Sequence, residues 1–227
     1  MLRSSHRPPR GGPRPAAALL VVVLLPAALF QVALFQAGCA GETRSVPFVN
    51  GTIDAFEDSD RRNALGNPWE AIAEGEGTYA DLDIPAGGFT DAGHFLIFDG
   101  YRPEGATGAQ VVGVRTSLLA DPAAADPERE PLAADVSAFT GLAFAVKGTP
   151  GTYIVQLGST QVSDFDFFNS YVEVTEEWSE FEIPFSRFRQ EGFGRSVAWD
   201  PATVSHVALY ANLTGNIRFS LDEVRFY

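Results

Sequence analysis

The chain has 227 residues, 45% of them hydrophobic, and a formal net charge of −13. This length fits one β-sandwich or two small domains, and 18 Phe, 6 Tyr and 3 Trp supply enough apolar surface for a packed core. Without the four arginines of residues 1–39, 12 basic and 29 acidic residues remain, a net charge of −17. Phosphate backbones repel such a chain, so we expect no nucleic acid partner.

Residues 1–39 predict an export signal. The first 15 residues are basic and rich in proline, and an apolar run follows from Ala16 to Phe35. A basic segment before an apolar segment with small residues at its exit is typical of secretory signals. The apolar run is also long enough to span a bilayer, so ordinary secretion and an uncleaved anchor remain alternatives.

Cys39 is the only cysteine of the chain and directly follows this run, in Gln36-Ala37-Gly38-Cys39. A lone cysteine forms no intramolecular disulfide. The tetrapeptide resembles the bacterial lipobox, whose cysteine is lipidated, although Gln36 stands where an aliphatic residue is usual. We therefore expect lipidation at Cys39, followed by a short polar tether over 40–48. The protein is then an exported, membrane-anchored lipoprotein facing the periplasm or the cell surface.

From residue 49 onward, short runs of period-two alternation are separated by Gly, Pro, Asn and Asp, and no long helical period occurs. We expect strands near 49–57, 68–74, 79–85, 94–99, 110–118, 141–147, 152–158, 169–175, 178–184, 205–211 and 216–226. We expect a loop over 119–133 and a single helical turn over Ser186–Gln190. Many short strands without long helices predict an all-β jelly-roll sandwich over 49–227.

The last predicted strand changes its apolar parity between Leu221 and Val224. One extra residue at Asp222-Glu223 produces such a change, which is typical of a β-bulge.

Several motifs, taken in their order and spacing, resemble those of known families. They are Ile53–Asp58, Asp135–Leu142, Thr152–Leu157, Trp178, Ile183–Ser186, Leu209–Asn212 and Leu221–Val224. Together they resemble the family 11 carbohydrate-binding modules and the related complex I intermediate-associated protein 30 domains, both galactose-binding-like jelly rolls. The resemblance covers about residues 50–227 and is densest from 135 onward.

This resemblance implies a concave sheet on which family 11 modules bind β-glucan chains. Tyr210 matches a sugar-contacting tyrosine of those modules. The residues after Phe188, Arg189 to Gly194, depart from the family's charged sugar contacts. The resemblance therefore supports the fold more strongly than a cellulose-type specificity.

Strand parity indicates the ligand face independently. With Val172, Val174, Val155, Leu157, Val207 and Leu209 in the core, the outer surface receives Asn169, Tyr171, Gln156 and Tyr210. Aromatic rings flanked by amides suit sugars, whose C–H faces stack while their hydroxyls take hydrogen bonds. The alternative is ordinary sheet surface. Trp69, which follows Gly66-Asn67-Pro68, is either a further ligand contact or a structural residue.

The run Asp164-Phe165-Asp166-Phe167-Phe168 has two interpretations. It is either a loop that offers exposed Phe rings as a binding rim or a strand edge buried by a neighbour. The pattern favours the strand edge.

Glu57 and Asp222 are candidate ligands of a structural calcium ion. They lie at the end of the first strand and at the predicted bulge of the last, which related jelly rolls bring together around Ca²⁺. Calcium requires six to eight hard oxygen ligands, which carboxylates and carbonyls supply. The alternative is a pair of acids flanking a surface turn.

Catalytic motifs do not stand out. Beyond residue 39 the only histidines are His94 and His206, neither in a metal-binding spacing. Paired carboxylates for glycoside hydrolysis stay open, but nothing singles out a pair. We therefore expect no enzyme. The leading hypothesis is a polysaccharide-binding envelope protein, and the alternatives are an interaction or assembly domain with an envelope protein partner, or a degenerate module that serves as a spacer.

Overall fold

The computed structural model describes residues 45–90, 93–105, 111–120 and 132–227. The chain divides into two units, Met1–Ala40 and Gly41–Tyr227, and only the second contains described residues. The predicted export signal, Cys39 and most of the predicted loop 119–133 lie outside the described residues. They therefore stay predictions.

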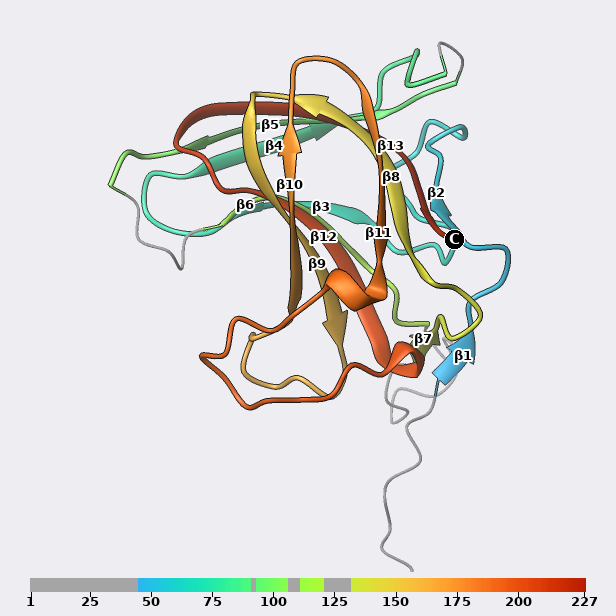
Figure 1. Cartoon of the computed structure of the whole chain (residues 1–227). Helices are drawn as coiled ribbons and strands as arrows, with labels where there is room; N and C mark the ends of the chain where they lie inside the picture. Colours follow the sequence, from blue (N-terminus) through green and yellow to red (C-terminus); the bar gives the residue numbers. More distant parts are fainter. Residues whose placement is uncertain (1–44, 91–92, 106–110, 121–131) are drawn as a thin grey trace, which may run out of the picture. The chain divides into compact units, whose positions relative to one another are not determined.

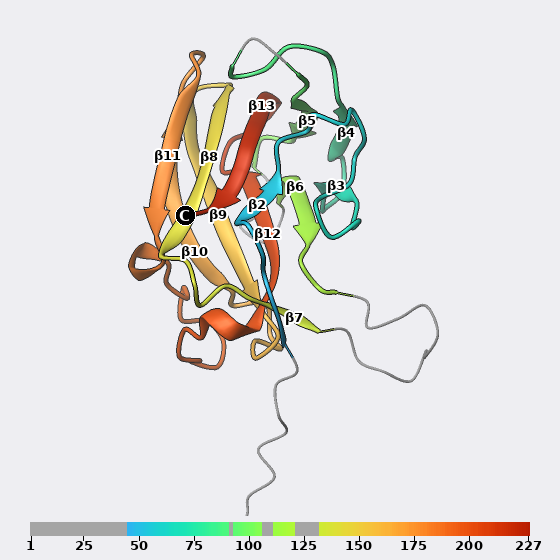
Figure 2. The same ribbon diagram turned by 90° about the vertical axis from the view of Figure 1, so that its right-hand side faces the viewer.

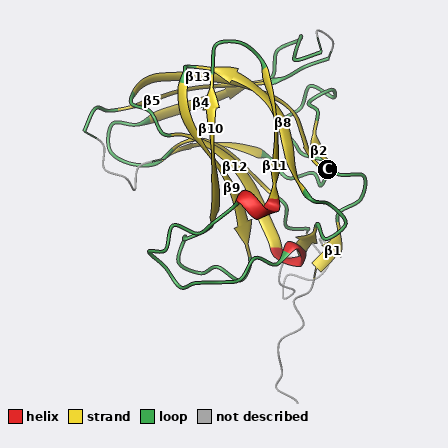
Figure 3. Cartoon of the chain, viewed as in Figure 1, coloured by secondary structure: helices red, strands yellow, loops and turns green. Residues whose placement is uncertain are grey.

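The described chain is all-β and forms two sheets (Figures 1 and 3). One sheet contains β1 (Ser45–Pro47), β3 (Trp69–Ala73), β6 (Val112–Ser117), β7 (Ala133–Asp135), β9 (Gly151–Ser159), β10 (Phe168–Val174) and β12 (Val204–Ala211). The other contains β2 (Thr52–Asp54), β4 (Tyr79–Asp83), β5 (Leu96–Arg102), β8 (Gly141–Gly148), β11 (Ser179–Pro184) and β13 (Gly215–Phe226). This arrangement confirms the predicted β-sandwich.

The body of the seven-stranded sheet runs β10–β9–β12–β6–β3, with every neighbouring pair antiparallel. At the start of β12, β7 pairs through Val204, and β1 adds to β7 as a parallel strand. The six-stranded sheet runs β11–β8–β13–β5–β4, and β2 pairs with the end of β13 (Figure 2). Residues far apart in sequence thus become neighbours on each sheet.

Alternating side chains of both sheets form the core. Phe98 of β5 stacks on Phe219 of β13 at 4.8 Å between ring centroids, and Tyr153 of β9 meets Phe219 edge-on at 5.5 Å. Tyr153 and Phe219 therefore join the two sheets. Burial of these large rings stabilises the fold, since each Å² of apolar surface removed from water contributes about 25 cal/mol.

The predicted bulge in the last strand is confirmed. The register of β13 against β8 shifts between Asp222 and Arg225, and Glu223 has a left-handed φ of 52°. The shift changes which residues of β13 face the core, so Leu221 and Val224 are both buried. It also places Asp222 at the irregular point of the strand.

The structure differs from the sequence prediction mainly in its shortest elements. β1 falls inside the segment expected to be a tether, and β7 extends from the end of the expected loop. Three-residue strands carry too few residues for a recognisable period. The expected helical turn is a 3₁₀ turn over Phe185–Arg187, and a second covers Pro201–Thr203. Neither these turns nor any other described segment forms a helix with the length and hydropathy to span a membrane.

Candidate functional site

The solvent side of strands β10, β9, β12, β6 and β3 is called the outer face here. Side chains of directly paired residues lie next to each other on one side of a sheet. The observed registers therefore produce two rows across three strands, Tyr171–Ile154–Tyr210 and Asn169–Gln156–Ala208. The predicted residues Tyr171, Asn169, Gln156 and Tyr210 thus share one side of the sheet.

A chain of hydrogen bonds links five polar side chains on this face, and we call them the polar row. Nε2 of His206 lies 3.1 Å from Oε1 of Gln156, whose Nε2 donates to Oδ1 of Asn169 at 3.0 Å. Nδ2 of Asn169 and the hydroxyl of Tyr171 both donate to Oε1 of Glu191, at 3.3 and 2.5 Å. The row therefore presents alternating donors and acceptors in fixed positions.

The protonation states of the polar row follow from its contacts. The hydrogen bond to Glu191 raises the pKa of Tyr171 to about 12. Burial, with Arg115 as a second cause, lowers the pKa of His206 to about 4. At neutral pH the phenol keeps its proton and the imidazole is uncharged. The row is thus arranged for hydrogen bonding rather than for proton transfer at that pH.

Tyr171 and Tyr210 differ in accessibility although they share a row. The ring of Tyr171, on the edge strand β10, is 49% exposed, whereas Tyr210 is 6% exposed. Tyr210 lies in the central strand, between Ile154 of β9 and Gly113 of β6. Burial raises its pKa to about 12, with Arg115 opposing the shift. Tyr210 therefore offers almost no open ring surface, and the exposed tyrosine ring on this face is that of Tyr171.

Trp69 lies on the opposite side of the sheet from the polar row. It is 4% exposed, packs on Phe56 at 5.6 Å, and donates from Nε1 to Oδ2 of Asp54 at 2.7 Å. Its neighbour Glu70 takes the outer face and pairs with Arg115. The structural interpretation of Trp69 is therefore correct, and its inclusion as a ligand contact is not supported, because the ring faces the core.

Glu191 is part of the polar row but was not singled out by the sequence. It lies in the loop 189–199, which the buried carboxylate of Asp166 holds in place. Asp166 accepts backbone N–H bonds from Glu191 at 2.8 Å and from Gly192 and Gly194 at 3.0 Å each. The only sequence signal was the departure of residues 189–194 from the family pattern, which marked this loop as different.

The Phe-rich run before β10 is a loop, so the favoured strand-edge interpretation is wrong. Phe165 has a φ of 66° and is 79% exposed, while Phe168 begins β10 and is buried. Phe167 is half-buried and meets the ring of His206 edge-on at 4.7 Å. The run therefore borders the polar row.

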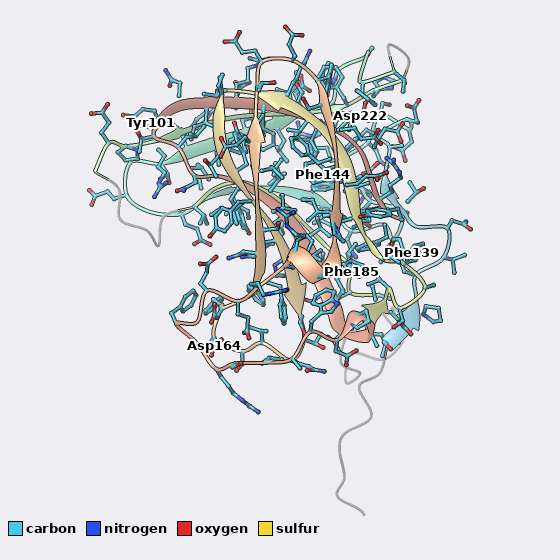
Figure 4. The ribbon with its side chains drawn as sticks, in the orientation of Figure 1. Tyr101, Phe139, Phe144, Asp164, Phe185 and Asp222 are labelled. Carbon is cyan, nitrogen blue, oxygen red and sulfur yellow. The ribbon has the colours of Figure 1, made fainter. Side chains whose placement is uncertain are left out.

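Asp222 lies at the end of the sandwich away from Asp164 (Figure 4), and Glu57 is close enough for its charge to act on Asp222. Burial raises the pKa of Asp222, and the charge of Glu57 raises it further. Asp222 accepts backbone N–H bonds from Phe89 and Glu223, both at 2.8 Å. Two carboxylates with hard oxygens fit calcium in ligand type. No group of three or more His, Cys, Asp or Glu suited to a metal occurs in the described part of the chain.

Comparison with known proteins identifies the relatives of this fold. Residues 112–222 match the family model of complex I intermediate-associated protein 30. No curated protein matches the chain. The family 11 carbohydrate-binding module of the cellulosomal cellulase Lic26A-Cel5E of Clostridium thermocellum is 18% identical, with a TM-score of 0.54 over 77% of this chain and 92% of the module.

Two further structures share the architecture. A family 11 module from Clostridium thermocellum, in complex with a β-1,3-1,4-mixed-linked tetrasaccharide, is 17% identical, with a TM-score of 0.55 over 78% of this chain and 94% of that chain. An exo-β-agarase is 10% identical, with a TM-score of 0.51 over 78% of this chain and 24% of the agarase. The resemblance expected from the motifs is confirmed, and at these identities the solved structures establish the fold.

Proposed function

We propose that this domain binds a glycan chain on its outer face, at the polar row, and performs no chemistry on it. The observation that carries the proposal is the hydrogen-bonded row of Gln156, Asn169 and Glu191 beside the exposed ring of Tyr171. Support also comes from the fold shared with family 11 modules, one of which is in complex with a mixed-linked tetrasaccharide.

Each side chain of the row has a role in this proposal. The ring of Tyr171 stacks on the C–H face of one sugar. The amides of Gln156 and Asn169 donate to and accept from hydroxyls, and Glu191 accepts from them. Because the row already fixes these groups, binding costs little side-chain ordering.

Glycan binding is tested with the purified full chain on a glycan array, followed by calorimetry on the best binder. Tyr171→Ala and Gln156→Ala are each expected to weaken affinity about tenfold, since each removes an interaction worth roughly 1–1.5 kcal/mol. The matched control is Tyr101→Ala, an exposed tyrosine on the other sheet, which should bind like wild type. An array without any hit rejects the proposal.

A second candidate function is that of an assembly or interaction domain, which would bind an envelope protein with the same face. The observation that favours it is the match to the complex I intermediate-associated protein 30 model over residues 112–222. Crosslinking in cells separates the two candidates. A specific partner that is lost in Tyr171→Ala, together with no glycan hit, favours the interaction domain.

We propose that calcium binds at Glu57 and Asp222 and stabilises the bulge of β13. Burial, and to a smaller extent the charge of Glu57, raises the pKa of Asp222, and a divalent cation would offset both effects. A chelator should lower the melting temperature of wild type but not that of Asp222→Asn. Equal melting temperatures of wild type with and without chelator reject the metal.

We propose further that the protein is an exported lipoprotein, anchored through Cys39 and facing the periplasm or the cell surface. Intact-mass analysis of the membrane fraction should give a lipidated chain that begins at Cys39. Globomycin treatment should make the unprocessed precursor accumulate. Cleavage at any other position rejects the anchor.

A further inference from the structure

Phe165 is the most exposed large hydrophobic side chain among the described residues, at 79%, and its backbone is left-handed, with φ at 66°. A bulky residue rarely adopts this conformation, because its Cβ meets the neighbouring backbone. Strain of this kind persists only where surrounding structure enforces it, and it is concentrated at functional sites. Phe165 therefore requires an explanation that burial does not provide.

The loop around Phe165 is held by carboxylates rather than by packing of the ring. Asp166 is buried and accepts backbone N–H bonds from Glu191, Gly192 and Gly194. Oδ2 of Asp164 accepts from the backbone N of Arg195 at 2.5 Å. Both residues that flank Phe165 are thus fastened to the loop that carries Glu191. The backbone that carries the exposed ring is consequently held in place.

Aromatic contacts connect Phe165 to the polar row. Its ring meets Phe167 edge-on at 6.3 Å, and Phe167 meets His206 edge-on at 4.7 Å. His206 in turn contacts Gln156 of the row at 3.1 Å. Phe165 is thus linked through Phe167 to His206 of the polar row, and its neighbour Asp166 bonds the backbone of Glu191.

We propose that Phe165 is a second sugar-stacking position that extends the polar row, so that the protein binds long glycan chains more tightly than short ones. This inference rests on the proposed glycan-binding function. A chain that stacks on Tyr171 and crosses the amides toward His206 and Phe167 would then reach the exposed ring of Phe165. An anionic lipid surface is a poorer match, because the domain is strongly acidic and Asp164 adjoins the ring.

Phe193 provides a matched control. It is 70% exposed and lies in the neighbouring loop, between two glycines. No aromatic contact ties Phe193 to Phe167 or His206 in the described residues. A non-specific effect of removing an exposed Phe from this end of the molecule therefore appears equally in both variants, and a stacking subsite affects only Phe165.

The test is calorimetry of the full chain. The first ligand is the β-1,3-1,4-mixed-linked tetrasaccharide, and the second is a series of increasing chain length of the glycan that binds best on the array. The variants are Phe165→Asn, whose side chain tolerates a left-handed backbone, and Phe193→Ala. We expect Phe165→Asn to lose about three- to tenfold in affinity for the longest chains and less than twofold for the shortest, with Phe193→Ala unchanged. Unchanged melting temperatures show that both variants fold.

Three outcomes would overturn the inference. One is wild-type affinity of Phe165→Asn at every chain length while Tyr171→Ala still loses binding, which leaves the proposed function intact. Another is an equal loss of affinity in Phe165→Asn for glycans of every chain length. The third is weaker binding of both Phe variants to phosphatidylcholine–phosphatidylglycerol vesicles with glycan affinity unchanged, which assigns the rings to lipid. Absence of any wild-type glycan binding instead rejects the proposed function itself.

Discussion

The outer sides of the two sheets use polar residues in different ways. On the seven-stranded sheet, the polar row joins its members in one chain and leaves the ring of Tyr171 open. On the six-stranded sheet, charges pair off, Arg218 with Asp99 at 3.1 Å and Arg225 with Glu180 at 2.6 Å. The seven-stranded sheet also carries an ion pair, Arg115 with Glu70, but it adds a shared polar network that the described ion pairs of the other sheet do not form.

Exposed tyrosines occur on both sheets, Tyr171 on one and Tyr79 and Tyr101 on the other, whereas Trp178 has aromatic and cationic neighbours. On the six-stranded side, Trp178 is covered by Phe89 and Phe95, at 6.0 and 5.9 Å, and Nζ of Lys147 lies 5.0 Å from its ring. These contacts leave the side chain of Trp178 half-buried. Among the described residues, only the polar row places an exposed aromatic ring within a connected network of polar side chains.

The largest expected effect concerns the carboxylate that fixes the loop beside the polar row. Asp166→Ala leaves the N–H groups of Glu191, Gly192 and Gly194 without their acceptor. We expect the free energy of unfolding to fall by about 3 kcal/mol, measured by urea denaturation. Asp164→Ala, at a more exposed position, should cost less. An equal cost for both variants contradicts the assignment of Asp166 as the main anchor.

The next effect concerns the contact between the two sheets at Asp54 of β2 and Trp69 of β3. Burial raises the pKa of Asp54 to about 6 from an ordinary value of 3.8, so the folded state favours the protonated form. The contribution of Asp54 to the free energy of unfolding is fully present below pH 4 and is lost as the pH rises through 6. The change amounts to at most about 2–3 kcal/mol. Denaturation profiles between pH 3 and 8 measure it. In Asp54→Asn the free energy of unfolding should no longer fall between pH 4 and 6 through this group. If variant and wild type show the same pH dependence, Asp54 does not cause the fall.

A smaller effect is expected on the six-stranded side. Arg218→Ala and Arg225→Ala remove exposed ion pairs, and exposed pairs contribute about 0–1 kcal/mol. Both variants should keep wild-type glycan affinity, because neither residue lies on the outer face with the polar row. A loss of glycan binding in either variant would contradict the assignment of binding to the seven-stranded sheet alone.

The smallest effect concerns pH and binding. His206 has a pKa near 4 and Tyr171 one near 12, so neither changes its charge between pH 5 and 8. Glycan affinity measured by calorimetry should be constant over this range and should change only as the pH approaches 4. A midpoint near 6.5 would mean that His206 is exposed in solution, in conflict with its burial against Phe167 and Gln156.

Local periodicity was enough to predict most strands, the bulge at Asp222-Glu223 and the common side of Tyr171, Asn169 and Gln156. Parity is a property of consecutive residues, so one strand is sufficient to assign it. The burial of Tyr210 depends on its neighbours in β6 and β9, which only the pairing reveals. Trp69 opens a strand with apolar residues on both sides, so its parity was ambiguous.

Glu191 illustrates a different limit. Its position depends on hydrogen bonds to Asp166, 25 residues earlier in the chain, and no periodic pattern encodes such a contact. The left-handed backbone of Phe165 could not be predicted from the sequence either, because glycine is the residue type that usually indicates this conformation. Loop residues fixed by tertiary contacts are therefore the part of the site that sequence reasoning missed.

The strand order has a consequence for how this domain is made. β13 lies in the middle of its sheet, between β8 and β5, although it comes after both in the chain. A growing chain that has not yet reached residue 215 therefore holds two half-sheets with open inner edges and no strand to join them. Such edges favour pairing with other chains. We therefore expect copies of the incomplete domain to associate unless they are kept apart until the twelve-residue strand β13 has been synthesised.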